Sequence, residues 1–264
     1  ARAALRIGAG LVTLATPGAA MMECAAQVTS LMLRRCDDAE GLSGLLEDRR
    51  INALCMGPGM GSEPDRRDVV SAALDATGHG LSVVLDADAL SCFEGAEAEL
   101  VAQLPKAAVI TPHGGEFSRV FPDLAERLHA PASTGPAYSK LDATRAAAIR
   151  AGCVVVFKGA DTVIAAPDGR CSVNSAQYER TAPWLATAGA GDVLAGIITS
   201  AYPSSAPSIS DTSPSEKDSG AIPQRRPAEV NNSAGCTAMT TTASVRPSHN
   251  LSIAPMTGSP LASA

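Results

Sequence analysis

The stretch LDATRAAAIRAGCVVVFKGADTVIAAPDG, residues 141–169, decides the fold class, because it contains a helix, a strand and a turn in quick succession. Residues 141–152 have a helical pattern, and residues 153–158 form an apolar, β-branched run typical of a buried strand. A second strand-like run, residues 161–167, follows too closely for a crossover helix. We therefore expect an antiparallel hairpin late in the sheet.

The same alternation of strands and helices recurs upstream. Apolar runs at residues 11–16, 52–57, 81–87 and 107–112 indicate strands, and residues 66–77 have the pattern of a helix between two of them. This order predicts an α/β fold with a mostly parallel sheet flanked by helices on both faces. In such sheets, ligands bind beyond the carboxyl ends of the strands.

Composition limits the function classes. The chain has 264 residues, 45% of them hydrophobic, and a formal net charge of -6. This size suits one α/β domain, and the negative charge argues against a nucleic-acid or anionic-membrane partner. No apolar run is long enough to span a bilayer. The seven cysteines lack metal-ligand spacing, and several, such as Cys55 and Cys153, lie in apolar runs. We expect them to be core residues of a cytoplasmic protein.

The chain changes character after Tyr202. Residues 203–264 are rich in serine, proline and threonine and have no sustained periodicity. Such a segment buries too little apolar surface to offset the entropy of ordering it. We expect a domain at residues 1–202 and a disordered or poorly packed tail at residues 203–264. The chain also begins within a helical pattern, so we expect a segment to precede Ala1.

Glycine and polar residues follow four of the predicted strands. They are Gly57, Gly59 and Gly61, then Asp86 and Asp88, then His113 and Glu116, and finally Lys158 and Gly159. Each has an ordinary structural alternative: a glycine-rich turn, a helix cap for Asp88, a structural or solvated histidine, and an exposed hairpin lysine. Asp86 could instead help to organise a metal-bound phosphate, and Lys158 could contact a phosphate.

The stretch LATAGAGDVLAGII, residues 185–198, places a glycine-bracketed turn before an apolar helix. Gly189 and Gly191 let the backbone approach a ligand, and a helix N-terminus suits phosphate. Asp192 lies in the first turn, where it could also be an ordinary helix-start residue. The turn is neither a P-loop, which needs Gly-Lys-Ser/Thr, nor a dinucleotide fingerprint, which needs glycine in place of Leu194.

Taken in order, the motifs GAGLVTLATP, GPGMG, LDADAL, ITPHGGE, FKGADTVI and LATAGAGDVLAGII resemble those of the ADP-dependent NAD(P)H-hydrate dehydratase family. The resemblance covers about residues 1–200 and implies the ribokinase-like fold. It also implies a reaction in which ADP or ATP, with Mg²⁺, drives dehydration of hydrated NADH or NADPH. A homo-oligomer is compatible with this resemblance.

The resemblance also assigns roles to residues. It implies that Asp192 is the catalytic base and contacts the hydrated substrate. The implied nucleotide contacts are Lys158, Gly159, Ala160, Asp161, Thr162, Gly189 and Gly191. The implied substrate contacts are Gly59, Gly61, His113 and Asp192. The resemblance assigns no residue as a metal ligand.

Some positions depart from the family pattern. Ala188 and Ala190 stand where glycine and serine or threonine are common, and Gly114 replaces a common proline. We expect the family's first strand and a glycine-containing substrate loop to lie before Ala1, and the Ser/Pro-rich segment replaces helices that normally follow residue 198. Two alternatives therefore stay open: a ribokinase-like kinase for a vitamin precursor, and an inactive remnant that binds nucleotide or a homologous subunit.

Overall fold

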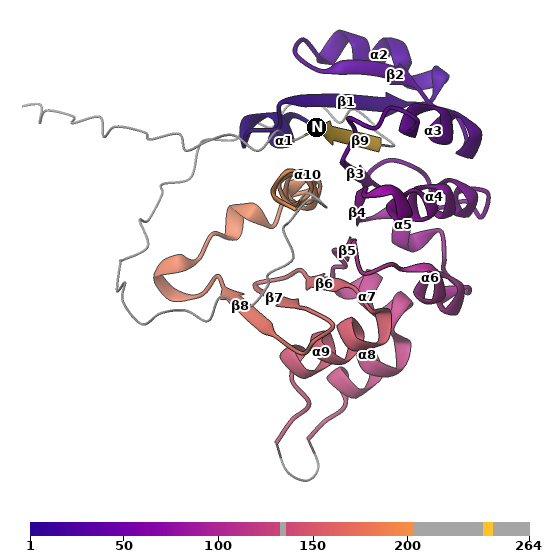
Figure 1. Ribbon diagram of the computed structural model, residues 1–264. Helices are drawn as coiled ribbons and strands as arrows, with labels where there is room; N and C mark the ends of the chain where they lie inside the picture. Colours follow the sequence, from indigo (N-terminus) through magenta and orange to yellow (C-terminus); the bar gives the residue numbers. More distant parts are fainter. Residues whose placement is uncertain (133–135, 203–239, 245–264) are drawn as a thin grey trace, which may run out of the picture.

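The computed structural model describes residues 1–132 and 136–202 and the backbone of residues 240–244. Its strands form one sheet in the order β2-β1-β9-β3-β4-β5-β6-β7-β8 (Figure 1). The strands are β1 Leu11–Thr16, β2 Met32–Arg35, β3 Ala53–Met56, β4 Ser82–Leu85, β5 Ala108–Ile110, β6 Val154–Phe157, β7 Asp161–Ala165, β8 Cys171–Ser175 and β9 Thr240–Ser244.

The pairing confirms the predicted α/β sheet and its late hairpin. Strands β3, β4, β5 and β6 pair in parallel, and β1 pairs in parallel with β2. Strands β6, β7 and β8 are antiparallel neighbours. The register of the parallel strands aligns Met56 with Leu85 and Leu85 with Ile110. The residues that follow these strands therefore lie along one edge of the sheet.

Helices cover both faces of the sheet (Figure 1). The α-helices are α1 Arg2–Arg6, α2 Met21–Gln27, α3 Ala39–Leu46, α4 Arg66–Asp75, α5 Asp88–Ser91, α6 Glu97–Gln103, α7 Gly114–Val120, α8 Pro122–His129, α9 Lys140–Ala151 and α10 Ala190–Ala201. Short 3-10 helices lie at Gly18–Ala20, Ala76–His79, Tyr178–Arg180 and Pro183–Leu185. Within the described residues, no helix is both long and apolar enough to cross a bilayer.

Alternate residues of the central strands pack on opposite faces of the sheet. Leu54, Leu85 and Phe157 belong to a large core that includes buried residues of α4, α7, α8 and α9. Val84 and Val156 face the other way and pack with Ala195 of α10. This two-residue period places α9 and α10 on opposite faces of the sheet.

Helix α9 has well-formed ends, which explains why its sequence pattern was clear. The Ser139 hydroxyl accepts from the backbone N–H of Asp142, and the Asp142 carboxylate accepts from the N–H of Ser139, which completes a capping box. Gly152 ends the helix in the left-handed conformation, with φ of 66°. These are the ordinary N-terminal and C-terminal signals of a helix.

Strand β9 was not predicted. It lies antiparallel between β1 and β3 and joins them, because Thr242 is the partner of both Thr13 and Leu54. The backbone of Thr240–Ser244 thus forms a paired strand within the segment that we expected to be a disordered or poorly packed tail. Its threonines have a high β-propensity that the surrounding composition masked. The other residues of the expected tail lie outside the described residues, so its disorder stays a prediction.

The cysteines give a test of the core. Burial raises the pKa of the Cys55 thiol to about 11 and that of Cys153 to about 12. Cys171 is only partly buried. We predict that iodoacetamide at pH 8 labels Cys171 at least roughly 100-fold faster than Cys55 or Cys153 in the native protein, because the thiolate is the reactive form.

Peptide mapping by mass spectrometry would measure this labelling, with the protein unfolded in guanidinium as the control in which all sites react. Rapid native labelling of Cys55 or Cys153 would show that the strand ends are not packed as described.

Candidate active site

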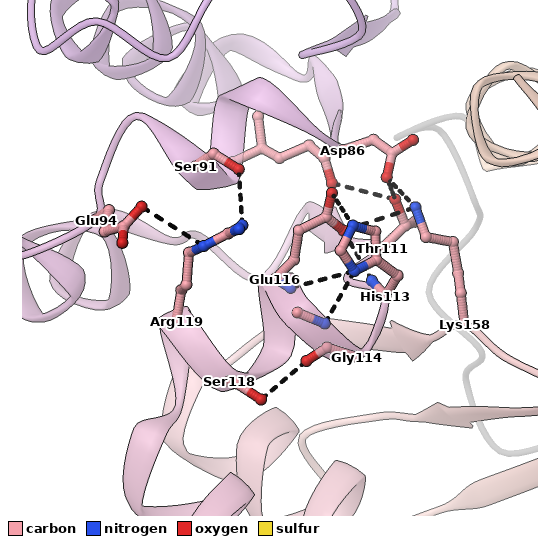
Figure 2. Close-up of polar contacts among 12 residues, drawn as sticks. Asp86, Ser91, Glu94, Thr111, His113, Gly114, Glu116, Ser118, Arg119 and Lys158 are labelled. Atoms are coloured by element: carbon pink, nitrogen blue, oxygen red, sulfur yellow. Dashed lines mark hydrogen bonds and ion pairs between the residues drawn. The ribbon is translucent and has the colours of Figure 1, made fainter. Parts of the chain in front are cut away.

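Three parallel strands end in side chains that meet at one edge of the sheet (Figure 2). Asp86 follows β4, Thr111 follows β5 and Lys158 follows β6. The Lys158 ammonium forms an ion pair with Asp86 Oδ1, and Thr111 Oγ1 donates to the same oxygen at 2.8 Å. The backbone N–H of Lys158 donates to the carbonyl of Pro112 at 2.9 Å, which continues the pairing of β5 and β6. Thus the strand register itself brings these groups together.

The centre of this site is buried and charged. The side chains of Asp86, Lys158 and Glu116 are 1%, 15% and 5% exposed, and Lys158 Nζ lies 3.8 Å from Glu116 Oε2. Among the described residues, Asp86 Oδ2 is buried with no hydrogen-bond partner. Buried polar atoms are nearly always paired in folded proteins. The unpaired oxygen is therefore a place where a ligand or cation can complete the structure.

The turn after β4 is strained and tightly packed. Ala87 has φ of 47° and ψ of -120°, a conformation that non-glycine residues rarely adopt. A Cβ atom at Gly57 would lie only 1.6 Å from the carbonyl oxygen of Asp86, so the two loops fit together only with glycine at that position. Strain of this kind persists where surrounding contacts enforce it, as they do here.

Asp88 links this turn to the glycine loop after β3. Its Oδ2 accepts from the backbone N–H of Gly61 at 3.0 Å. The expected capping role is wrong, since Ala87 occupies the N-cap position and makes no side-chain cap. Gly59 and Gly61 both have positive φ, of 69° and 86°. The loop that contains the predicted substrate contacts is thus held beside Asp86.

His113 has a structural role that can be stated from its contacts. Its Nδ1 accepts from the backbone N–H groups of Gly115 at 3.0 Å and Glu116 at 3.3 Å, which caps α7. The Glu116 carboxylate in turn accepts from the N–H of His113 at 2.7 Å. Because Nδ1 accepts, the network assigns the ring proton to Nε2. The ring is still 56% exposed, so it is accessible to a ligand.

The N-terminus of α10 lies against the ion pair. Gly189 is the N-cap, with φ of 86°. A Cβ atom at Gly191 would lie 3.2 Å from Lys158 Nζ and 3.8 Å from Asp86 Oδ2. The structure therefore brings Gly191 and Lys158 together, as the sequence predicted.

Asp192 lies in the first turn of α10, where its side chain is exposed but close to the Asp86 and Lys158 charges. Partial desolvation raises the pKa of its carboxyl above the ordinary value, and the Asp86 carboxylate raises it further, while Lys158 opposes the shift. A carboxylate whose proton affinity is raised in this way is a better general base near neutral pH.

The turn after β6 uses its side chains for its own structure. The Asp161 carboxylate accepts from Ser175 Oγ at 2.6 Å and from Gln177 Nε2 at 3.2 Å. Thr162 Oγ1 donates to the carbonyl of Gly159 at 3.2 Å, and the N–H of Ala176 donates to the carbonyl of Ala160 at 2.9 Å. The Asp161 and Thr162 side chains therefore hold the turn together, and the backbone is what the turn offers a ligand.

The structure places further residues at the site, to which the sequence had assigned no role. Thr111 gave no sequence signal beyond its place at a strand end, and Glu116 was noted only as part of the same loop. Lys140 gave no signal at all, although its ammonium contacts the turn after β6. Among the described residues, no group of three or more His, Cys, Asp or Glu side chains is arranged to hold a metal.

Curated relatives match most of this chain. A bifunctional NAD(P)H-hydrate repair enzyme of Gloeobacter violaceus is 36% identical over 197 residues, which are 72% of this chain and 34% of that protein. Its counterpart in Moorella thermoacetica is 32% identical over 206 residues, 75% of this chain and 36% of that protein. The chain thus spans about a third of the length of these relatives.

Solved structures share the fold. A ribokinase-like superfamily protein of Enterococcus faecalis is 24% identical with a TM-score of 0.57, over 75% of this chain and 63% of that one. An ADP/ATP-dependent NAD(P)H-hydrate dehydratase of Bacillus subtilis, co-crystallised with ATP and Mg²⁺, is 25% identical with a TM-score of 0.55, over 75% of this chain and 64% of that one.

The family model for NAD(P)H-hydrate dehydratase matches residues 1–214, which is well over half of the chain. The relatives and the ribokinase-like neighbours agree with that match. The chain therefore belongs to the NAD(P)H-hydrate dehydratase family and has the ribokinase-like fold.

Proposed function

We propose that this domain uses ADP or ATP to dehydrate the hydrated cofactors (S)-NADHX and (S)-NADPHX to NADH and NADPH. The observation that carries the proposal is the meeting of Lys158, Asp86 and Asp192 at the N-terminus of α10. This arrangement combines phosphate-binding groups with a carboxylate of raised proton affinity. The similar Bacillus subtilis protein is an ADP/ATP-dependent NAD(P)H-hydrate dehydratase.

Asp192 acts as the general base in this proposal. It takes the proton from the hydroxyl group on the hydrated nicotinamide ring, and the hydroxyl oxygen then attacks the terminal phosphorus of the nucleotide. The bond between that phosphorus and its bridging oxygen breaks, so ADP leaves as AMP. Phosphate is a far better leaving group than hydroxide. Loss of phosphate and a ring proton restores the dihydronicotinamide double bond.

We assign the nucleotide phosphates to the N-terminus of α10. Backbone N–H groups near Gly189 and Gly191, together with the Lys158 ammonium, form an anion-binding corner. We assign the turn of Lys158, Gly159, Ala160, Asp161 and Thr162 to the AMP portion, through its backbone. The substrate would lie between this corner, the Gly59–Gly61 loop and His113.

Mg²⁺ fits this arrangement at Asp86. The unpaired Oδ2 supplies one carboxylate ligand, and Mg²⁺ in nucleotide sites usually takes one or two carboxylates plus phosphate oxygens and water. The nearby Glu116 carboxylate is the second candidate. When bound, the ion would neutralise charge on the transferring phosphoryl group.

The kinase and remnant alternatives predict assay results that differ from those of a dehydratase. An ordinary ATP-dependent kinase would not use ADP as the phosphoryl donor, and a remnant would not turn over NADHX with either nucleotide. Incubation with NADHX and Mg²⁺, plus ADP or ATP in separate reactions, therefore tests the proposal by the appearance of NADH fluorescence.

A cytoplasmic location suits the buried free thiols Cys55 and Cys153.

We predict that Asp192→Asn lowers dehydration of NADHX at least ~100-fold, because positioned general bases contribute about that much or more. The ADP affinity should stay within about twofold, because the amide keeps the shape of the side chain. Turnover and calorimetric binding would be measured side by side.

Asp68→Asn is the matched control, because Asp68 is also an exposed aspartate in the first turn of a helix, but on α4. It should leave turnover unchanged. Near-normal turnover in Asp192→Asn would remove Asp192 from the mechanism.

Lys158→Ala should weaken ADP binding by about 1.5–3 kcal/mol, the usual worth of a hydrogen bond to a charged group. It should also destabilise the fold by roughly 3–5 kcal/mol, because it leaves the buried Asp86 charge without its partner. Calorimetry and urea unfolding would measure the two effects.

The double variant Lys158→Met with Asp86→Asn separates these effects. It removes both charges, so it should recover most of the lost stability without recovering ADP affinity. Unchanged ADP affinity in Lys158→Ala would contradict the phosphate assignment.

The raised pKa of Asp192 predicts the direction in which protein stability changes with pH. Folding favours its neutral form, so its contribution to stability is largest below the ordinary carboxyl pKa and is lost as pH rises through the folded pKa. We predict that Asp192→Asn is more stable than the wild type at pH 7, and that this difference disappears toward pH 4. Urea unfolding at both pH values would measure it, and an equal difference at both would refute the shift.

A further inference from the structure

Helix α9 begins with a lysine that reaches under the turn after β6. Lys140 Nζ donates to the carbonyl oxygen of Lys158 at 3.0 Å and to that of Asp161 at 2.5 Å. These carbonyls stand at the two ends of the turn, and no other function has been assigned to Lys140. One ammonium group therefore joins the end of β6 to the start of β7.

The ammonium is held in place from several sides. It lies 4.1 Å from the centroid of the Phe157 ring, in a cation–π contact. The Phe157 ring is itself stacked on Phe117, with centroids 4.1 Å apart and planes 5° from parallel. A Cβ atom at Gly159 would lie 2.7 Å from Lys140 Nζ, so glycine leaves room for the ammonium.

These contacts fix the direction of the carbonyls of Lys158 and Asp161. In a trans peptide the C=O and the following N–H point in opposite directions. Because the carbonyl of Lys158 points to Lys140, the N–H of Gly159 points away from the Lys140 ammonium. The N–H of Thr162 instead faces β8, since Thr162 pairs with Asn174 in the β7–β8 ladder. The Lys158 side chain, which directly precedes the Gly159 N–H, lies against Gly191 at the N-terminus of α10.

We propose that Lys140 is a positioning residue for the nucleotide, which holds the backbone of the 158–162 turn so that the N–H of Gly159 can bind the phosphate of the AMP portion. The inference rests on the proposed function, because the turn is assigned there to the AMP portion. Lys140 does not touch the nucleotide itself. Burial lowers the pKa of the Lys140 ammonium, which fits a cation enclosed beneath the turn.

The test compares two substitutions at Lys140 with a control on the same helix. Lys140→Met keeps the apolar stem but removes the donor, and Lys140→Arg keeps the charge and can still donate to carbonyls. Arg145→Met is the matched control, because Arg145 Nε donates to the carbonyl of Gly169 at 3.1 Å, in the turn at the far end of β7. All three retain the α9 capping box.

Calorimetry with ADP and Mg²⁺ should show about tenfold weaker binding for Lys140→Met, in line with the loss of a charged donor. Lys140→Arg should recover most of the affinity, and Arg145→Met should stay within about twofold of the wild type. In turnover assays, Lys140→Met should raise KM for ADP with little change in KM for NADHX. A purely structural role would instead lower the melting temperature of both Met variants without separating their ADP affinities.

The outcomes are distinguishable. If the wild type binds ADP and the Lys140→Met variant binds it equally well, this inference is overturned but the proposed function is not. Equal weakening by Arg145→Met would do the same, because the effect would then not be specific to the turn. A wild type that binds neither ADP nor ATP would overturn the proposed function, and this inference with it.

Discussion

The ion pair between Asp86 and Lys158 is the contact on which the rest of the site depends. It joins the ends of β4 and β6 across β5, although the two residues are 72 positions apart in the chain. A buried ion pair is tolerated only where geometry and further polar contacts compensate for lost water. Thr111 supplies a hydrogen bond to Asp86, and Glu116 supplies a second carboxylate near Lys158. A one-residue slip of β4 or β6 would move these charges to the opposite face. Strand register and site are therefore one constraint.

Much of the fold could be predicted because its signals are local. The β-branched runs, the capped helix α9 and the short connection after Lys158 each report on neighbouring residues. The placement of Lys158 and Asp192 near one another followed from a general property of parallel sheets, whose carboxyl ends share an edge. The contacts that escaped prediction are long-range ones. Lys140 reaches the turn from a helix, and Asp88 reaches Gly61 from another strand end. Strand β9 depends on partners more than 180 residues earlier, which no local pattern encodes.

The site gathers two kinds of groups that need different support. In the proposed site, backbone donors near Gly191 and in the turn after β6 must be oriented, whereas the side chains of Asp86 and Lys158 must be shielded from water to interact strongly. Orientation is provided from outside the site by Lys140, Ser175 and Gln177. The close approach of α10 to the strand ends shields these side chains from water. In the proposed site, neither task falls to the residues assigned to the substrate, so many of the residues that the site needs would not touch the substrate themselves.

The close fit of Gly57 against the Asp86 carbonyl bears on how this domain can evolve. Any side chain at position 57 would push the end of β4 away and carry Asp86 with it. Substitution of Gly57 is therefore not tolerated. Gly114 is in the opposite situation, since a Cβ atom would meet nothing within 4 Å and its backbone is helical. Other residues can replace it without steric cost, and lineages are free to differ there. Two glycines that follow strands of the same sheet therefore differ in mutational freedom: Gly57 cannot be substituted because of the neighbouring Asp86 carbonyl, whereas Gly114 can.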